Sequence, residues 1–421
     1  MNFCEENKSN LGKYESFLET GLKKNNSHNY ISLEDCSCDD NFLKVQQKEF
    51  FDYNDLIEIQ QHMRCSANTK VDCKPLVTKL LISLERSNDI KAKEIIFWII
   101  ASIFQDNKNL IHDFIDIILI VSQENIMNIS SDKVLEQILY MLIYISENMK
   151  LELGQIYFNF LLIYFNNNID TNDGNNNCCL ILNLISMNIK QFDDNFLRCI
   201  AKNLLNYLDL NDISILALIL KILINIIEIT DYELTDIQIH KIIQLSNSST
   251  TILVENSLDL LINYSSKKQN INIDIHQIFN IKLSFYPNIF QKILNLGLVI
   301  SKNSLFYSEN VFSIIITKDI NALNFESKKI VLKIIKISTK TMMLKEINAK
   351  ILLFLSSLML SDDEEILLDS INIIYKFKDV LPFLDENLII NLESLSQHNN
   401  KLISSNSTLL LNYIKENMHP S

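Results

Sequence analysis

The chain has 421 residues, of which 48% are hydrophobic, but it contains only 5 glycines and 4 prolines. Strands and tight turns need more Gly and Pro than this, so the composition predicts long helices joined by short polar loops. The formal net charge of −13 argues against a nucleic-acid binder, because phosphate contacts require clustered Lys and Arg. An acidic surface instead suits basic protein partners.

The sequence also argues against export and membrane insertion. Its start, residues 1–6, is polar and acidic, so we expect no signal peptide. Apolar stretches such as residues 215–229 are interrupted by charged side chains and are too short to span a membrane. The 8 cysteines are therefore expected to be reduced thiols in the cytoplasm or nucleus. Cys36 and Cys38 have no second pair at zinc spacing, so no metal is expected.

In chain order, residues 1–50 lack a repeat and are expected to be flexible. A shortened unit follows at residues 56–84 and is expected to cap the array. Nine longer segments then share one form, a polar start, an apolar run at helical spacing and a polar exit. The first spans residues 88–106, and the array as a whole spans residues 51–417. Residues 418–421 form a tail.

Equivalent helical positions of the nine segments, which we call the anchors, recur every 36 to 42 residues. A period near 40 residues is typical of armadillo and HEAT arrays, and it predicts an all-α, right-handed superhelical solenoid of about nine or ten repeats. Each unit has too much apolar surface to bury alone, so neighbouring units bury it together. The anchors are Trp98, Tyr140, Cys179, Lys221, Asp259, Asn295, Leu332, Ile371 and Leu409.

The anchor helices are predicted to lie side by side and to line the concave face of the solenoid. Residues four apart project from the same face of a helix, so each anchor pairs with the residue one turn later. We expect the binding chemistry of the protein at these pairs.

Several of these segments resemble the importin alpha family, the adaptors that carry nuclear localisation signals. Glu136-Gln137 with Tyr140 and Ile145 looks like the start of the family's third repeat. Residues 177–184 are similar to its fourth repeat, Asn-Ala-Thr-Trp-Thr-Leu-Ser-Asn-Leu. Residues 396–400, followed by residues 412–414, resemble the last repeat, His-Glu-Asn followed by Glu-X-Tyr-Phe.

The amino-terminal segment carries a related similarity. Lys13, Phe17 and Gly21 stand at the spacing of Arg-X-X-X-Phe-X-X-X-Gly in the family's importin-beta-binding region, and residues 42–49 are similar to a later part of it. Most of the family's basic residues are absent here. The resemblance therefore makes importin beta a candidate partner through residues 1–50.

The resemblance also implies a peptide-binding groove. In the family, Asn amides hold an extended peptide by its backbone, and Trp faces hold the stems of Lys and Arg. Asn148 stands where the family has the Asp that receives a critical Lys, and Asp259 stands where the family has Arg. The peptide-binding residues implied in this chain are Trp98, Ser102, Tyr140, Tyr144, Asn183, Asn225, Asp259 and Asn263, and Cys179 stands one turn before Asn183 where the family has Trp.

Each of these residues also has a purely structural interpretation. Trp98 lies in an apolar run and is equally suited to the core. Tyr140 and Tyr144 are suited to packing with their hydroxyls at the surface. The three asparagines form either a ladder that binds a peptide backbone or a ladder of internal hydrogen bonds between adjacent helices, because an unpaired buried amide is costly.

No catalytic motif is present: the chain has no HExxH, no Walker loop, no GxGxxG and no GxSxG. We therefore expect neither an enzyme nor a cofactor. The leading hypothesis is an importin-alpha-like adaptor, in the cytoplasm and nucleus, that binds basic or extended cargo segments in its groove for nuclear import, with no nucleic-acid or membrane partner. The alternatives are an armadillo/HEAT scaffold and a regulatory subunit of an enzyme complex, neither with a transport role.

Overall fold

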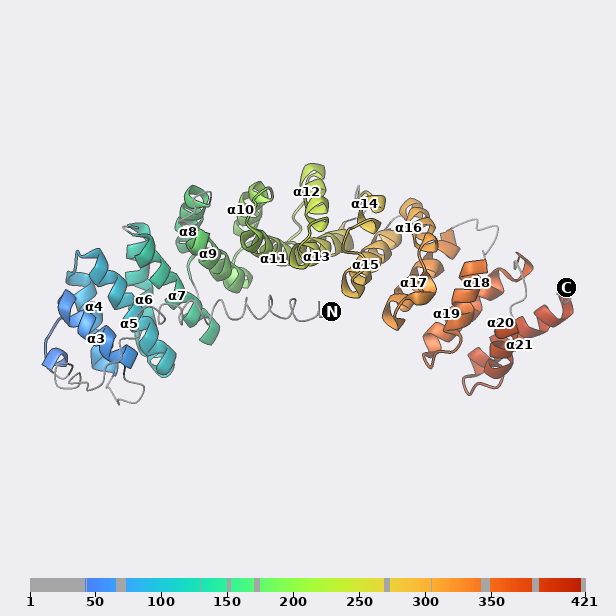
Figure 1. The fold of residues 1–421 in the computed structure, drawn as a ribbon, viewed down its shortest axis with the longest axis horizontal. Helices are drawn as coiled ribbons and strands as arrows, with labels where there is room; N and C mark the ends of the chain where they lie inside the picture. The colour runs from blue at the N-terminus through green and yellow to red at the C-terminus, as the bar shows by residue number, and fades with distance from the viewer. Residues whose placement is uncertain are drawn as a thin grey trace, which may run out of the picture. The chain divides into compact units, whose positions relative to one another are not determined.

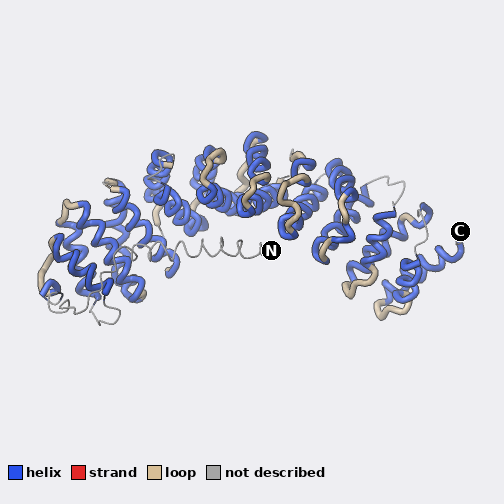
Figure 2. The backbone as a smooth tube through the Cα atoms, in the orientation of Figure 1, coloured by secondary structure: helices blue, strands red, loops and turns tan. Residues whose placement is uncertain are grey.

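The computed structural model describes residues 42, 44–65, 73–129, 131–149, 153–169, 175–268, 273–303, 305–341, 349–380 and 386–417. Over these ranges the chain is helical with short loops, and no strand occurs in them (Figure 2). The predicted all-α class is therefore confirmed. Residues 1–41, with Cys36, Cys38 and the segment that resembles an importin-beta-binding region, lie outside the described residues, as does the tail at 418–421.

The described helices form one leading helix and nine consecutive pairs, which is the architecture of an armadillo/HEAT-type solenoid. Four short 3₁₀ turns occur between them, η1 (Ile189–Gln191), η2 (Leu205–Tyr207), η3 (Ile320–Ala322) and η4 (Lys378–Val380). The leading helix is α3 (Tyr53–Cys65), and the first helices of the pairs are α4 (Cys73–Arg86), α6 (Asn109–Met127), α8 (Gln155–Asn168), α10 (Asp194–Leu204), α12 (Asp236–Ser246), α14 (Ile275–Phe279), α16 (Leu305–Thr317), α18 (Ala349–Leu358) and α20 (Glu386–Leu395). The second helices are α5 (Ile90–Asp106), α7 (Asp132–Asn148), α9 (Asn175–Asn188), α11 (Ile213–Ile229), α13 (Thr251–Lys267), α15 (Pro287–Asn303), α17 (Phe325–Thr341), α19 (Glu364–Lys376) and α21 (Lys401–Asn417).

The chain divides into two compact units, Met1–Asn188 and Ile189–Ser421. In unit 1, α3, α5, α7 and α9 pack in succession, and α4, α6 and α8 each pack on the second helix of their own pair. In unit 2 the corresponding layer consists of the second helices α11, α13, α15, α17, α19 and α21. The first helices of unit 2 form a second layer against it (Figure 1). Each unit is thus a two-layer stack in which the apolar side chains of one pair are buried against the next.

The nine predicted anchors fall one in each of the nine second helices. Seven of these helices are 17 residues long, and in six of them the anchor is the ninth residue. The exception is α17, in which the ninth residue is Lys333 and the chosen anchor Leu332 is buried. In α19 the chosen anchor Ile371 is also buried, whereas the next residue, Asn372, is exposed. At these two positions the predicted register is wrong by one residue.

Aspartates at the polar start of several segments fix where the helices begin. The side chain of Asp212 accepts hydrogen bonds from the backbone N–H groups of Ser214 and Ile215 at the start of α11. Asp89 accepts one from Lys91 at the start of α5. These bonds satisfy N–H groups that have no partner within the helix, which explains why the repeat begins with polar residues.

The opposite helix ends are capped from the neighbouring repeat. Lys267 Nζ at the end of α13 donates to the carbonyl oxygens of Glu228 (2.7 Å) and Thr230 (3.2 Å) at the end of α11. Asn303 at the end of α15 donates in the same way to Lys268 O (3.1 Å). In unit 1, the Tyr144 hydroxyl donates to Gln105 O (3.3 Å). In these three cases a second helix supplies donors to the unpaired carbonyl groups at the end of the preceding one, which ties adjacent repeats together.

The described end of the amino-terminal segment packs on the first helices. The Phe42 ring stacks on His62 of α3 with centroids 3.9 Å apart, and its side chain is buried. Lys48 Nζ lies 2.5 Å from Asp55 Oδ1, and Phe51 N donates to Ser83 Oγ at 2.8 Å. Residues from 42 onward therefore contribute to the first repeat of unit 1.

Candidate functional site

The residues one turn after the anchors lie on one face of the second-helix layer, which we call the ladder face. In unit 1 it carries Ser102, Tyr144 and Asn183, and in unit 2 it carries Asn225, Asn263 and Tyr413. All six side chains are at least partly exposed. The ladder face is thus accessible in both units.

Two of the three aromatic residues predicted to bind in unit 1, Trp98 and Tyr140, are largely covered. Trp98 is 9% exposed and Tyr140 is 8% exposed. The guanidinium carbon of Arg64, from α3, lies 5.1 Å from the centroid of the Trp98 ring, where a bound cation was expected. The Ser102 hydroxyl donates to the Trp98 carbonyl oxygen at 2.9 Å. These positions therefore make internal contacts in this structure.

Tyr140 belongs to a polar group between α7 and α9. Burial raises the pKa of the Tyr140 hydroxyl, although a hydrogen bond with Asn176 partly offsets this. Asn176 Nδ2 also donates to Glu136 Oε1 at 2.6 Å. Burial likewise raises the pKa of the Glu136 carboxyl. The hydrogen bonds of the Asn176 amide with Glu136 and Tyr140 therefore join α9 to α7.

The predicted asparagines differ from the aromatic residues in having free amides. Asn183, Asn225 and Asn263 are half-buried, and no side-chain hydrogen bond joins them to any other part of the chain that the structure describes. Within unit 2, Asn225 and Asn263 lie on α11 and α13, which pack side by side. Their amides can therefore donate to and accept from an external partner.

A hollow of about 580 Å³ lies between α13 and α15 in unit 2. It includes the predicted residue Asp259 and the anchor Asn295, so it opens on the ladder face. Ile262, Leu298 and Val299 supply its apolar lining. Its polar lining is Glu255, Asp259, Asn288, Gln291, Lys292 and Asn295.

The charges of the hollow are unequal. Lys292 Nζ lies 2.5 Å from Asp259 Oδ2, so these two charges pair across the hollow. Glu255 is one helical turn before Asp259, and it has no ion-pair partner among the described residues. The hollow therefore carries one excess negative charge, which favours a cationic side chain.

The amides of α15 were missed by the sequence reasoning. Asn288, Gln291 and Asn295 are spaced by three and four residues, so they follow one face of the helix, and all three line the hollow. None has a side-chain hydrogen bond within the described ranges. Their spacing of three and four residues is the signal in the sequence that predicts such a row, whereas the repeat pattern predicts only one amide per repeat.

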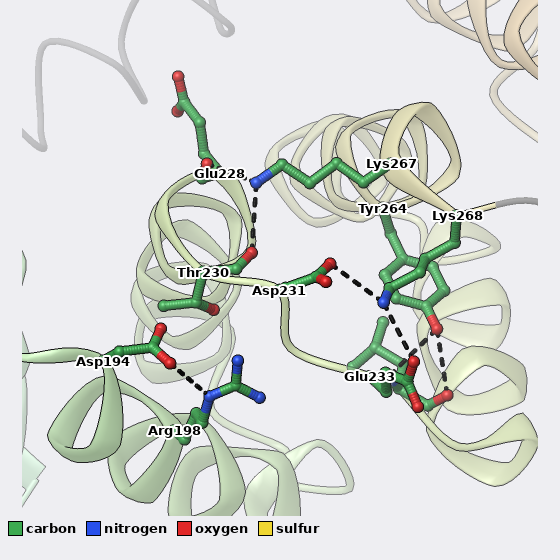
Figure 3. Close-up of polar contacts among 10 residues, drawn as sticks. Asp194, Arg198, Glu228, Thr230, Asp231, Glu233, Tyr264, Lys267 and Lys268 are labelled. Atoms are coloured by element: carbon green, nitrogen blue, oxygen red, sulfur yellow. Dashed lines mark hydrogen bonds and ion pairs between the residues drawn. The ribbon is translucent and has the colours of Figure 1, made fainter.

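A second polar cluster lies at the carboxyl ends of α11 and α13 (Figure 3). Unlike most of those in the hollow, its polar groups are paired with one another. Lys268 Nζ lies 3.0 Å from Asp231 Oδ1 and 3.1 Å from Glu233 Oε1, in the loop after α11. This hydrogen bond from Lys268 holds the pKa of Asp231 below its usual value. The Tyr264 hydroxyl donates to Leu234 O at 3.3 Å. Because these groups satisfy one another, the cluster stabilises the loop and leaves little binding capacity.

No metal site and no membrane helix emerge from the described ranges. They contain no group of three or more His, Cys, Asp or Glu side chains that could hold a metal ion. No helix in them is long and apolar enough to cross a bilayer.

Fold and ladder face together define a helical-repeat protein of the armadillo/HEAT class. Similar solved structures include the karyopherin Kap121p, at 13% identity and a TM-score of 0.43 over 95% of this chain and 43% of that one. Kap121p bound to RanGTP is similar at 11% identity and a TM-score of 0.40, over 94% of this chain and 49% of that one. An engineered protein matches 61% of this chain and 96% of its own length, at 10% identity and a TM-score of 0.33.

This chain spans less than half the length of the karyopherin structures that it matches. At these identities the similarity concerns the helical-repeat fold alone. No protein-family model matches the sequence, and a search of curated proteins gives no match. The specific resemblance to importin alpha therefore remains a hypothesis.

Proposed function

We propose that the protein binds an extended segment of another protein along the ladder face of unit 2. The observation that carries this proposal is the row of three free amides on α15, which lines the hollow beside the unpaired carboxylate of Glu255. An amide side chain both donates and accepts, so a row of them can pair with the N–H and C=O groups of an extended backbone. Asn225 and Asn263 offer the same chemistry on α11 and α13.

The charge of the hollow favours a basic segment. Glu255 and Asp259 supply two carboxylates against the single ammonium of Lys292. A Lys or Arg side chain of the partner would neutralise Glu255, while Ile262 and Leu298 would contact its aliphatic stem. The overall charge of −13 attracts the same class of partner over a longer range.

The biological role that we propose is that of an importin-alpha-like adaptor, which carries bound cargo from the cytoplasm into the nucleus. The role rests on the resemblance of residues 136–145, 177–184 and 396–414 to repeats of that family, together with the free amides of Asn183 and Asn263. Importin beta is the proposed partner of residues 1–50. We propose a binding protein and not an enzyme.

A scaffold or regulatory subunit without a transport role is the second candidate. The contact between Arg64 and Trp98 favours this candidate. A carrier of basic signals would need the Trp98 ring to be accessible, but Arg64 lies over it. A scaffold of this kind would use the amides and the hollow but would not discriminate between basic and neutral segments.

Calorimetric titration separates these candidates. The chain would be titrated with a basic signal peptide and with its Lys-to-Ala version, and both would be repeated on the double variant Gln291→Ala/Asn295→Ala. Removal of two hydrogen-bonding amides should weaken binding about 5- to 150-fold, at about 0.5–1.5 kcal/mol for each bond. Asn280→Ala, an exposed amide after α14 and outside the hollow, serves as the matched control and should have no effect.

Three results would count against these proposals. Equal affinity of the double variant and the wild type would overturn the hollow as the binding site. Equal binding of the two peptides would favour the scaffold over the adaptor. Binding of neither peptide at any concentration tested would overturn the adaptor role.

A further inference from the structure

Two tyrosines on consecutive second helices of unit 2 enclose a lysine. Tyr375 lies on α19 and Tyr413 on α21, 38 residues apart in the sequence. Lys378 Nζ, on the turn η4, is 4.2 Å from the centroid of the Tyr375 ring and 4.6 Å from that of Tyr413. We call these two rings the tyrosine slot.

The tyrosine slot holds its cation by ring faces alone. No carboxylate lies within ion-pair distance of Lys378 among the described residues. The neighbouring Asp379 instead accepts the hydrogen bond of the Tyr413 hydroxyl, which fixes the orientation of that ring. Tyr375 is 38% exposed, and Tyr413 and Lys378 are half-buried, so solvent reaches the slot.

We propose that the tyrosine slot is a binding subsite for a Lys or Arg side chain of a partner segment, and that Lys378 occupies it in the unbound protein. This inference rests on the proposed binding of an extended segment, but it uses a different part of unit 2 from the hollow between α13 and α15. Exchange of one cation for another preserves the attraction to both rings. An Arg side chain gains further, because its planar guanidinium stacks on aromatic faces.

Displacement of Lys378 breaks no ion pair with the described residues, and its half-buried side chain is already in contact with solvent. Once displaced, it moves away from the incoming cation into solvent, where the four-carbon stem has several accessible conformations. A partner therefore competes only with the attraction between Lys378 and the two rings.

The experiment removes the Lys378 side chain from the tyrosine slot and measures the affinity for two short peptides. One peptide has a central arginine, and the other has citrulline at the same position. Lys378→Ala should tighten binding of the arginine peptide about 3- to 10-fold, the range of one cation–π contact. The citrulline peptide, which has the same shape without the charge, should show no gain. Lys401→Ala removes one exposed lysine of α21 outside the slot and controls for the loss of positive charge.

The rings are tested in the same background. Lys378→Ala/Tyr413→Ala should lose the gain, whereas Lys378→Ala/Tyr413→Phe, which keeps the ring, should retain it; circular dichroism verifies that each variant is folded. A gain no larger than that of Lys401→Ala, or an equal gain for the citrulline peptide, would overturn the inference. If Gln291→Ala/Asn295→Ala weakens binding of the basic signal peptide while Lys378→Ala brings no gain, this inference fails and the proposed function stands. If the wild type binds no signal peptide but Lys378→Ala gains affinity for the arginine peptide, the slot stands without the adaptor.

Discussion

The guanidinium of Arg64 lies over the ring of Trp98, with 5.1 Å between the guanidinium carbon and the ring centroid. Arg64 comes from α3 and Trp98 from α5, so this contact joins the leading helix to the first full repeat. The same arrangement recurs in unit 2, where Lys378 lies between two tyrosines. In each unit a cation of the chain itself occupies an aromatic surface, and at Trp98 this is a position where the sequence predicted a ligand.

Removal of the Arg64 guanidinium should expose Trp98 to solvent. Trp98 is the single tryptophan of the chain, so intrinsic fluorescence reports on it alone. We expect Arg64→Ala to increase quenching by acrylamide and to cost about 0.5–1 kcal/mol of stability from the lost cation–π contact. Arg86→Ala, which removes a similar contact with Phe50 at 5.2 Å, should leave the quenching unchanged. Unchanged quenching in Arg64→Ala would show that other side chains cover the ring.

The ion pair between Lys336 and Asp369 should stabilise the packing of α17 on α19. Lys336 Nζ lies 2.5 and 2.8 Å from the two carboxylate oxygens, and Asp369 is only 8% exposed. Lys336→Met leaves this carboxylate buried without a partner and should cost about 1–3 kcal/mol in chemical denaturation. The double variant Lys336→Met/Asp369→Leu should recover most of the loss. A double variant as unstable as the single one would show that the pair itself, and not the isolated charge, determines the cost.

Gly297 should be intolerant of a large side chain. It lies on α15 where this helix meets α14 and α16, and a Cβ atom there would be 3.1 Å from Val311 Cγ1 and 3.3 Å from Phe279 Cζ. We expect Gly297→Leu to lower the free energy of unfolding by at least about 2 kcal/mol, because the added atoms overpack this contact. Gly154→Ala, at a glycine with no atom within 4 Å of the added Cβ, is the control and should change stability much less. Equal losses in the two variants would contradict this interpretation.

The periodicity of the sequence was sufficient to predict the fold. All nine anchors fell in separate second helices, because a repeat of nearly constant length places its apolar run in the same helix each time. At two anchors the predicted position was wrong by one residue, because a run of apolar side chains does not by itself mark which of two neighbouring residues is exposed. Leu332 and Ile371 are buried next to the exposed Lys333 and Asn372. A one-residue error rotates a helical position by about 100°, which is enough to move it from the surface to the core.

The site was less predictable because it depends on contacts between distant residues. Nothing in the residues around Trp98 indicates that Arg64, 34 residues earlier, covers the ring. The pairing of Asp259 with Lys292 likewise depends on how α13 packs on α15. The exposure of Asn183, Asn225 and Asn263 was easier to predict, because a residue one turn after a correctly placed anchor lies on the same helix face.

Glu136 should make the stability of the protein depend on pH. Burial raises the pKa of this carboxyl above its ordinary value of 4.5, with a further contribution from the negative charge of Glu94, whereas Asn176 and Lys133 act in the opposite direction. A raised pKa in the folded state means that the protonated carboxyl is favoured by folding. Its contribution to stability is therefore fully present below pH 4.5 and is lost as the pH rises through the folded-state pKa.

The variant Glu136→Gln tests this dependence, because it keeps an oxygen that can accept the hydrogen bond of Asn176 but cannot ionise. Thermal unfolding would be measured from pH 4.5 to pH 7.5 for the wild type, for Glu136→Gln and for Glu124→Gln, which changes an exposed carboxylate of α6. We expect Glu136→Gln to lose less stability than the wild type between these two pH values, because it lacks the buried charge. The Glu124→Gln profile should follow that of the wild type. If all three profiles are parallel, the Glu136 carboxyl is as well solvated in the folded chain as in the unfolded one, and the seam between α7 and α9 is open to water.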